Sequence, residues 1–280
     1  MSAARRVSLE PAFLLHHYPW RDTSRILELL TRSHGRVSVI ARATRQSSSV
    51  KGNPLQTFGA TLVSWSASGE IGYLTGVERT SFTSPIAMGE VDRRSGEGGP
   101  SPARSATSPA AAGEVGTLAG DRLMSGFYAN ELLLKLLQRN DPHPALFDAY
   151  AALLERLYAP AEDPGRALRL FEKRLLDELG WGLNLEHEAG SGAPLEPARS
   201  YRYGLEGGAE PVDGVAEGTL IFCGASLLSL AHEDLRDARS LADARRLLRA
   251  ALDRLLDGRP LRTREVLLEM RAHTGTADGG

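Results

Sequence analysis

Residues 26–41, ILELLTRSHGRVSVIA, contain two apolar runs separated by a short polar turn. Branched and aliphatic residues fill both runs, which is typical of β-strands. The break at residues 33–35, SHG, has the glycine and the small polar residue of a tight reversal. The stretch therefore predicts an antiparallel hairpin with strands at residues 26–30 and 36–41.

Three similar runs flank this hairpin, at residues 12–16, 61–65 and 72–77, and Ser68-Gly69 predicts a second hairpin between the last two. Five short antiparallel strands can avoid exposed edges by closing into a small barrel, and the five-stranded OB-type barrel is the commonest solution of that size. We therefore expect an OB-type barrel in residues 1–80. An SH3-like barrel and a small open sheet are the alternatives.

The pattern changes after this region. Residues 89–117 are rich in Gly, Ser, Pro and Ala, the composition of a flexible linker or an inserted loop. From residue 118 to residue 272 apolar residues recur at helical spacing, which predicts a mostly helical domain. The expected helices lie at residues 120–139, 146–157, 163–180, 225–236, 241–257 and 263–272.

Punctuation residues sharpen part of this assignment. Asp163 suits an N-cap, Pro164 the first helical position, and Gly180 the end of the same helix. Residues 181–218 predict a loop-rich excursion with a short extended piece at residues 201–203, and residues 273–280 predict a disordered tail. The fold class we expect is α+β, an OB-type barrel followed by a mostly α-helical domain.

Charge is distributed unevenly along the chain. The net charge is −2, yet residues 1–58 carry nine basic and three acidic side chains. Positive charge concentrated in one part of a chain is typical of a module that binds a polyanion, because phosphates are neutralised locally. The alternative is a chance fluctuation on a solvated surface.

Residues 41–52, ARATRQSSSVKG, combine three cations with several hydroxyl groups and no acid. Phosphate oxygens accept hydrogen bonds from such groups, so this loop beside a barrel is a candidate site for nucleic-acid strands. The aromatic and basic residues of the first inter-strand loop supply the opposite wall. The candidate binding residues are Trp20, Arg21, Arg25, Arg36, Arg42, Arg45 and Lys51, with Arg262 and Arg264 in a C-terminal basic turn.

Each of these candidates has a simpler interpretation. The cations of the loop can remain solvated, Tyr18 and Trp20 can pack on the mouth of the barrel, and Arg262 and Arg264 can cap the last helix. Sequence reasoning alone leaves both interpretations open.

Catalytic and metal-binding patterns are missing from the sequence. No Gly-Lys-Ser/Thr phosphate loop occurs, and no His spacing places two ligands on one helical face. The single cysteine, Cys223, reads as a small buried hydrophobe. The apolar patch at residues 12–15 is too short for a secretory or membrane segment. We expect a cytoplasmic protein that is not an enzyme and needs no metal or cofactor.

The order and spacing of several sequence segments match those of one known protein family. They lie at residues 12–16, 29–36, 55–58, 127–133, 141–147, 171–183 and 259–265. The Thr-Arg-x-His-Gly-Arg turn at residues 31–36 and the basic, Ser-rich loop after it are the most distinctive. Together these segments resemble the RecO family of bacterial recombination-repair mediators.

The resemblance implies an OB-fold followed by a helical domain, binding of single- and double-stranded DNA, annealing of complementary strands, and help in loading the RecA recombinase on coated single strands. It implies RecR and the acidic C-terminal tail of the single-stranded-DNA-binding protein as partners, a functional link to RecF, and a place at the bacterial nucleoid without membrane attachment. The alternative function is a protein-interaction adaptor without strong DNA affinity of its own.

One departure from the family concerns zinc. Some members of the family carry a four-cysteine zinc site after the segment that matches residues 181–183. The first pair of those positions falls near Glu188 and Ser191 here, and no cysteines follow near residues 203–211. We therefore predict no zinc.

Overall fold

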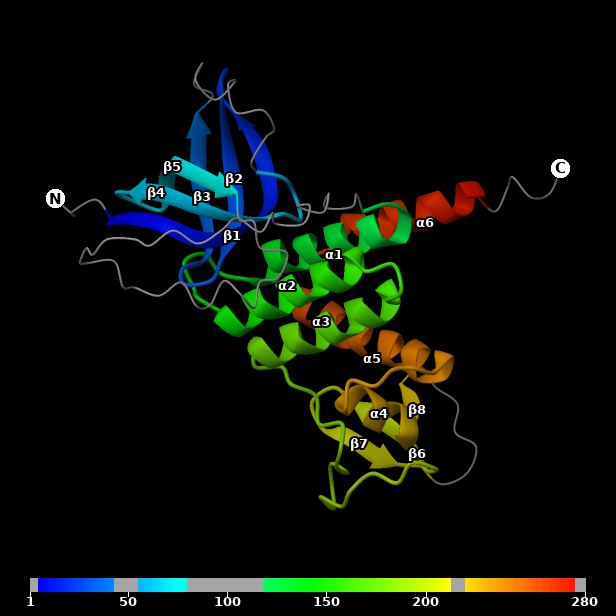
Figure 1. Cartoon of the computed structure of the whole chain (residues 1–280). Coiled ribbons are helices and arrows are strands. Elements are labelled where there is room, and N and C mark those ends of the chain that lie inside the picture. The colour runs from blue at the N-terminus through cyan, green and yellow to red at the C-terminus, as the bar shows by residue number, and fades with distance from the viewer. Residues whose placement is uncertain (1–4, 43–54, 80–117, 213–219, 275–280) are drawn as a thin grey trace, which may run out of the picture.

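The computed structural model describes residues 5–42, 55–79, 118–212 and 220–274 (Figure 1). The predictions for Arg45, Lys51 and the linker fall outside these ranges. Of the tail, residues 275–280 also fall outside, whereas residues 273 and 274 belong to the last helix rather than to a disordered end.

The first part of the chain is a closed five-stranded barrel. Its strands run in the order β1-β2-β3-β5-β4, and β3 and β5 pair in parallel while the other pairs are antiparallel. The expected barrel is therefore confirmed, and its closure excludes the open sheet. The expectation of purely antiparallel strands was wrong for β3 and β5, whose parallel pairing closes the barrel. The strands are β1 (Arg5–Trp20), β2 (Ser24–Thr31), β3 (Gly35–Arg42), β4 (Ala60–Ala67) and β5 (Ile71–Arg79).

Alternation of buried and exposed residues builds the interior of the barrel. Leu14, Leu29, Val39 and Trp65 belong to one buried apolar cluster inside it. Strand β1 is much longer than the predicted run at residues 12–16. Its register shifts at two irregularities, one between Val7 and Glu10 and one between Leu14 and His16. Such bulges interrupt the period of two that marks a strand in a sequence.

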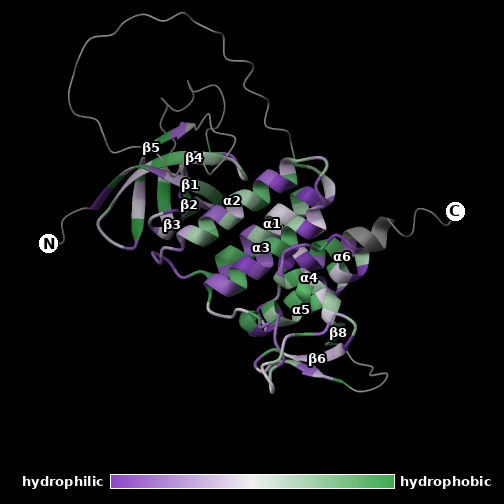
Figure 2. Cartoon of the chain, turned by 60° about the horizontal axis from the view of Figure 1, so that its bottom comes forward, coloured by the Kyte–Doolittle hydropathy of each residue, from purple (hydrophilic) through white to green (hydrophobic). Residues whose placement is uncertain are grey.

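Six helices and a small sheet follow in the described part of the chain (Figure 2). The three-stranded sheet has the order β7-β6-β8. No helix among the described residues has the length and apolar character required to cross a bilayer. The elements are α1 (Gly120–Leu136), α2 (Pro144–Tyr158), α3 (Pro164–Glu178), β6 (Ser200–Gly204), β7 (Gly208–Pro211), β8 (Ile221–Cys223), α4 (Gly224–Ala231), α5 (Ala238–Leu256) and α6 (Arg262–Thr274).

Local sequence signals predicted both ends of α3 correctly, but not the C-terminal end of α4. The Asp163 side chain accepts a hydrogen bond from the Gly165 N–H at 2.7 Å, and Gly180 follows the helix with φ +79°, so both predicted ends are confirmed. Helix α4 was expected to reach residue 236 but ends at Ala231. Glu233 and Leu235 lie in the left-handed region, which no α-helix can include.

The small sheet forms a lobe beside the helices, and β8 was not anticipated from the sequence. Tyr201 and Phe222 are fully buried within this lobe. Cys223 is only partly buried, and its Sγ donates to the Pro197 carbonyl at 3.0 Å. The interpretation of Cys223 as a buried hydrophobe was therefore wrong, because this residue at the end of β8 is only partly covered.

The barrel and the helices share part of one apolar core. Phe13 and Leu30 of the barrel belong to the same buried cluster as the helical interior. The Asn130 amide in α1 donates to the Leu15 carbonyl at 3.0 Å, and Tyr150 donates to Asn130 at 2.5 Å. Because these buried polar groups are paired across the boundary, the junction is specific as well as apolar.

The turn between β2 and β3 also meets the helical domain. Gly35 has φ +66°, and a Cβ atom there would stand 1.9 Å from the Asp141 carbonyl oxygen. Only glycine allows this approach of two backbones. The Asn140 N–H donates to the Arg36 carbonyl at 2.9 Å beside it.

Candidate nucleic-acid interface

One row of side chains crosses four strands on the outer face of the barrel. Tyr18 pairs with Ile26, Ile26 with Ile40, and Ile40 with Tyr73. Directly paired residues point to the same side of a sheet, so the four side chains form one continuous strip. Tyr18 is 45% exposed and Tyr73 43% exposed, while the two isoleucines between them are partly buried. The strip therefore presents an aromatic ring at each end of an apolar floor.

The next row adds a tryptophan and a cation. Trp20 pairs with Ser24, and Ser24 pairs with Arg42. The Arg42 guanidinium carbon lies 5.0 Å from the centre of the Tyr73 ring, within cation–π distance. Two residues along each strand from the first row, Trp20 and Arg42 lie on the same side of the sheet. Tyr18, Trp20, Arg42 and Tyr73 are called the aromatic face below.

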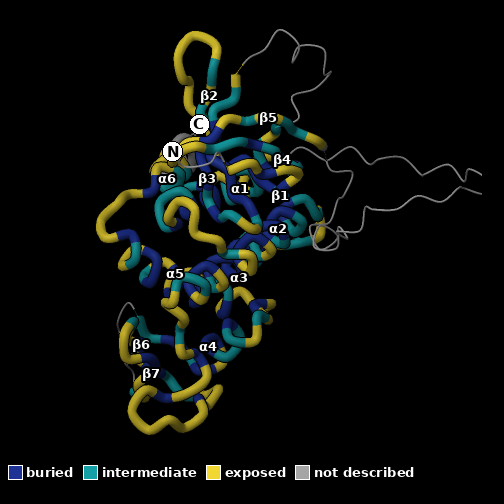
Figure 3. Tube along the Cα trace, turned by 90° about the vertical axis from the view of Figure 1, so that its left-hand side faces the viewer, coloured by how far each residue is buried: buried dark blue, intermediate teal, exposed yellow. Residues whose placement is uncertain are grey.

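The aromatic face extends toward the tip of the β1–β2 hairpin. This tip is exposed and projects beyond the rest of the barrel, away from the helical domain (Figure 3). Arg21 sits in the turn with φ +53°, and its guanidinium lies 6.0 Å from the Trp20 ring. Exposed rings beside guanidinium groups are the combination with which sequence-tolerant single-strand sites stack bases and hold phosphates.

The structure brings some of the predicted site residues together and separates others. Trp20, Arg21 and Arg42 lie on or next to the aromatic face. Arg25 is exposed but pairs with Pro19 and Ala41, which puts it on the opposite side of the hairpin.

Arg36 has a different role from the predicted one. Its side chain is only 15% exposed, and its Nε donates to Glu28 at 3.0 Å. Its Nη1 donates to the carbonyls of Leu134 and Leu137 at the end of α1. The guanidinium is thus engaged at the junction of barrel and helices, and we remove Arg36 from the candidate DNA surface.

Glu28 is the centre of that junction. Ser38 donates to it at 2.8 Å, and Arg139 of the helical domain donates at 2.8 Å. Burial by itself would raise the pKa of Glu28, but the hydrogen bonds from Ser38 and Arg36 and the Arg36 charge outweigh it. The pKa of Glu28 is therefore held below its ordinary value, and the carboxylate stays ionised.

Arg262 and Arg264 lie on α6, beside α1 and away from the aromatic face. The Arg262 side chain is exposed, and its backbone N–H donates to Glu131 at 2.9 Å. Arg264 is mostly buried, forms an ion pair with Asp253 and donates to the Tyr128 hydroxyl at 3.1 Å. Of the two arginines in the predicted basic turn, Arg262 is therefore exposed to solvent and Arg264 makes internal contacts.

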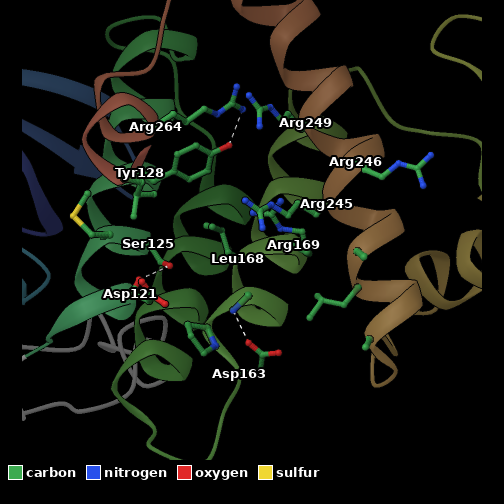
Figure 4. A pocket seen from close by; sticks show the side chains of 17 residues that line it. Asp121, Ser125, Tyr128, Asp163, Leu168, Arg169, Arg245, Arg246, Arg249 and Arg264 are labelled. Carbon is green, nitrogen blue, oxygen red and sulfur yellow. Dashed lines mark hydrogen bonds between the residues drawn. The ribbon is translucent and has the colours of Figure 1, made fainter. Parts of the chain in front are cut away.

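Arg264 also borders a pocket of about 720 Å³ between α1, α3, α5 and α6. Four guanidinium groups project into this space, while Arg246 is turned away toward the Phe222 ring (Figure 4). We call it the arginine pocket. Its basic side chains are Arg169, Arg245, Arg246, Arg249 and Arg264, and its apolar ones include Met124, Leu168, Leu241 and Leu267.

Sequence reasoning did not find this pocket. Arg245 and Arg249 stand four residues apart on an exposed face of α5, a spacing visible in the sequence. Arg169 and Arg264 come from other helices, and the chain contains many arginines at similar spacings. Only the packing of α1, α3 and α6 against α5 identifies the members of the cluster.

The two positions that correspond to the first cysteine pair of zinc-binding family members take part in hydrogen bonds. Ser191 donates to Glu188 at 2.6 Å, and Arg199 lies 3.6 Å from the same carboxylate. In the described ranges, no three His, Cys, Asp or Glu side chains converge as metal ligands would. A hydroxyl and a carboxylate already bonded to each other do not fit a structural zinc site, which takes thiolate and imidazole ligands.

Fold and site together define a class of protein, a small β-barrel joined to a helical domain, with arginines gathered at two separate places. Family models for the N-terminal and C-terminal parts of recombination protein O match residues 6–82 and 118–265. The chain belongs to the RecO family, which confirms the resemblance seen in the sequence.

Relatives of similar length support the same assignment. The chain is 36% identical to DNA repair protein RecO of Aromatoleum aromaticum, over 97% of this chain and 99% of that protein. It is 38% identical to DNA repair protein RecO of Coxiella burnetii, over 94% and 99%. It is 35% identical to the protein of the same name from Burkholderia pseudomallei, over 95% and 85%.

Proposed function

We propose that this protein is a DNA-binding recombination mediator in DNA repair, acting without covalent chemistry. It binds single- and double-stranded DNA, anneals complementary strands and helps to load RecA on coated single strands. The observation that carries the proposal is the aromatic face, where three exposed rings and Arg42 share one side of the barrel. Bases stack on such rings without regard to sequence, since every base has a π-face.

Annealing follows from the same arrangement. Two DNA strands repel each other through their phosphates, and cations such as Arg21 and Arg42 lower that repulsion. Contacts to phosphate and ring faces carry no sequence information, so the base edges remain available for pairing. The exposed hairpin allows a second strand to approach the bound one (Figure 3).

The arginine pocket is the proposed contact for the acidic tail of the single-stranded-DNA-binding protein. Its guanidinium groups suit carboxylates, and its apolar wall, which includes Leu168 and Leu241, suits the apolar side chains of the same tail. Partnership with RecR and the functional link to RecA and RecF rest on family membership alone. The proposed location is the bacterial cytoplasm, at the nucleoid.

A second candidate function is the adaptor without strong DNA affinity. The arginine pocket favours it, because this pocket lies entirely in the helical domain and needs no residue of the barrel. An adaptor of this kind would bind an acidic peptide normally after the aromatic face is removed, and the full chain would bind single strands weakly and with little dependence on salt.

Fluorescence anisotropy of a labelled single strand of about 30 nucleotides tests the DNA-binding proposal. The affinity of the wild-type protein and of each variant is measured over a series of salt concentrations. We expect Trp20→Ala to weaken binding by about 5-fold to 100-fold, the loss of one stacked base. Arg42→Ala should reduce the slope of log affinity against log salt by about 0.7, the value for one phosphate contact on a single strand.

Trp181→Ala is the matched control, because Trp181 is a similarly exposed tryptophan of the helical domain. It should leave the affinity for the strand unchanged. Equal affinities for the wild-type protein and the Trp20 and Arg42 variants would overturn the assignment of the aromatic face and favour the adaptor.

A further inference from the structure

A buried carboxylate lies behind the wall of the arginine pocket. Glu172 of α3 is 0% exposed, and neither of its oxygens has a hydrogen-bond partner. Its Oε1 lies 3.0 Å from Nη2 of Arg169, one turn earlier on the same helix, and Arg169 lines the pocket. Burying a charge with so little compensation costs free energy, so the ion pair by itself does not account for a buried glutamate at this position.

Every helix around the pocket contributes a group that acts on Glu172. Tyr128 of α1 favours the charged form, against the effect of burial, and so do the arginines of the other helices, Arg169 of α3, Arg264 of α6 and Arg245 of α5. Burial is the largest influence, and the pKa of Glu172 is raised above its ordinary value. Because Arg169, Arg245 and Arg264 both line the pocket and favour ionised Glu172, a change of charge in the pocket shifts the protonation equilibrium of this carboxyl group.

Arg169 faces two competing partners. Within the protein it pairs with Glu172, and its side chain, 9% exposed, also lines the pocket in which a ligand carboxylate would lie. Two carboxylates that share one guanidinium repel each other, and protonation of one relieves the repulsion. The buried member of the pair is the one that burial already favours in the neutral form.

We propose that Glu172 makes the binding of an anionic peptide in the arginine pocket proton-linked, so that a ligand carboxylate and a proton are taken up together. Deprotonated Glu172 competes with the ligand for Arg169, and protonated Glu172 releases Arg169 to it. The inference rests on the proposed function of the pocket and adds the residue that regulates it.

The direction of the pH dependence follows. A bound carboxylate raises the pKa of Glu172 further, so peptide affinity is greatest at low pH and falls as pH rises through the pKa of the free protein. Each pKa unit that the ligand adds corresponds to a tenfold change in affinity. No histidine is among the residues that line the pocket, so none of the lining residues ordinarily titrates near neutral pH.

The test uses the full chain and a fluorescent pentapeptide of three aspartates, a leucine and a C-terminal phenylalanine. Its anisotropy is followed from pH 5.5 to pH 8.5. We expect wild-type affinity to fall with rising pH, and Glu172→Gln to bind about 3-fold to 10-fold tighter than wild type at the upper end, with no pH dependence. Glu188→Gln is the control, a buried carboxylate near an arginine outside the pocket, and should behave as wild type.

Calorimetry of the wild-type protein in two buffers of different ionisation enthalpy measures proton uptake directly and needs no variant. Net uptake of a proton on binding supports the linkage. Peptide binding that is independent of pH, without proton uptake, overturns the role of Glu172 and leaves the pocket's proposed function intact. No peptide binding at any pH overturns the pocket assignment itself, and the linkage with it.

Discussion

Two places in the molecule contain a buried glutamate beside an arginine: the junction between the barrel and the helical domain, and the region behind the arginine pocket. The pKa of the glutamate is shifted in opposite directions at these two places. Glu28 at the junction accepts hydrogen bonds from Ser38, Arg36 and Arg139, and its pKa is lowered. Glu172 behind the pocket has ion-pair contact with Arg169 but no hydrogen bond, and its pKa is raised.

The comparison indicates that the number of hydrogen-bond donors, rather than the presence of an arginine, determines whether a buried carboxylate stays ionised. Three donors replace the lost hydration of Glu28, so the charge persists and ties β2 and β3 to α1. Glu172 lacks such donors, and burial raises its pKa above the ordinary value. The first arrangement suits a permanent joint and the second suits a site that responds to a ligand.

The largest effect is expected from breaking the junction. Glu28→Ala removes the carboxylate that pairs with the Arg36 guanidinium and leaves this mostly buried charge without it. We expect the free energy of unfolding, measured with urea, to fall by about 3–5 kcal/mol. Glu70→Ala, an exposed glutamate in the turn between β4 and β5, should change it by less than about 0.5 kcal/mol. Equal effects of the two changes would contradict the role of the junction.

Opposite pH dependences should distinguish the two glutamates. Because folding lowers the pKa of Glu28 below its ordinary value of 4.5, its contribution to stability is present above that value and is lost as pH falls through the folded-state pKa. Because folding raises the pKa of Glu172, its contribution is complete below the ordinary value and is lost as pH rises through the folded-state pKa.

Urea unfolding from pH 3.5 to pH 9 measures both dependences. The stability lost in Glu28→Gln should shrink toward acid pH. Glu172→Gln should become more stable relative to wild type as pH rises, by about 1.4 kcal/mol for each unit of pKa shift. Parallel pH profiles for the two variants would show that the donors around the carboxylates do not govern their ionisation.

A smaller effect is expected when Glu28 loses one hydrogen-bond donor, which should shift its pKa in the direction seen for Glu172. Ser38→Ala removes one of the three donors and should cost about 1 kcal/mol of unfolding free energy. The pKa of Glu28 should rise, which NMR titration of the labelled carboxyl group would detect. Ser66→Ala on β4 is the control and should leave that titration unchanged. An unshifted Glu28 titration in Ser38→Ala would mean that the two arginines alone keep the charge in place.

Local patterns carried much of the architecture. The hairpin at residues 26–41 and the ends of α3 followed from apolar runs, turn residues and caps, which act over a few neighbouring residues. The bulged ends of β1 and the early end of α4 did not, since bulges and left-handed residues have no strong local signal. For the candidate site, Trp20, Arg21 and Arg42 were predicted from type and position alone, and the structure places them next to one another.

The sequence by itself determined a strand-rich basic segment, a helical remainder and membership of the RecO family. Only the tertiary structure decided what each arginine does. It placed Arg42 beside Tyr73, engaged Arg36 at the domain junction, and gathered Arg169 and Arg264 around one pocket. The physical reason is that a guanidinium keeps its charge wherever it lies, while its burial and its partners come from elements far apart along the chain.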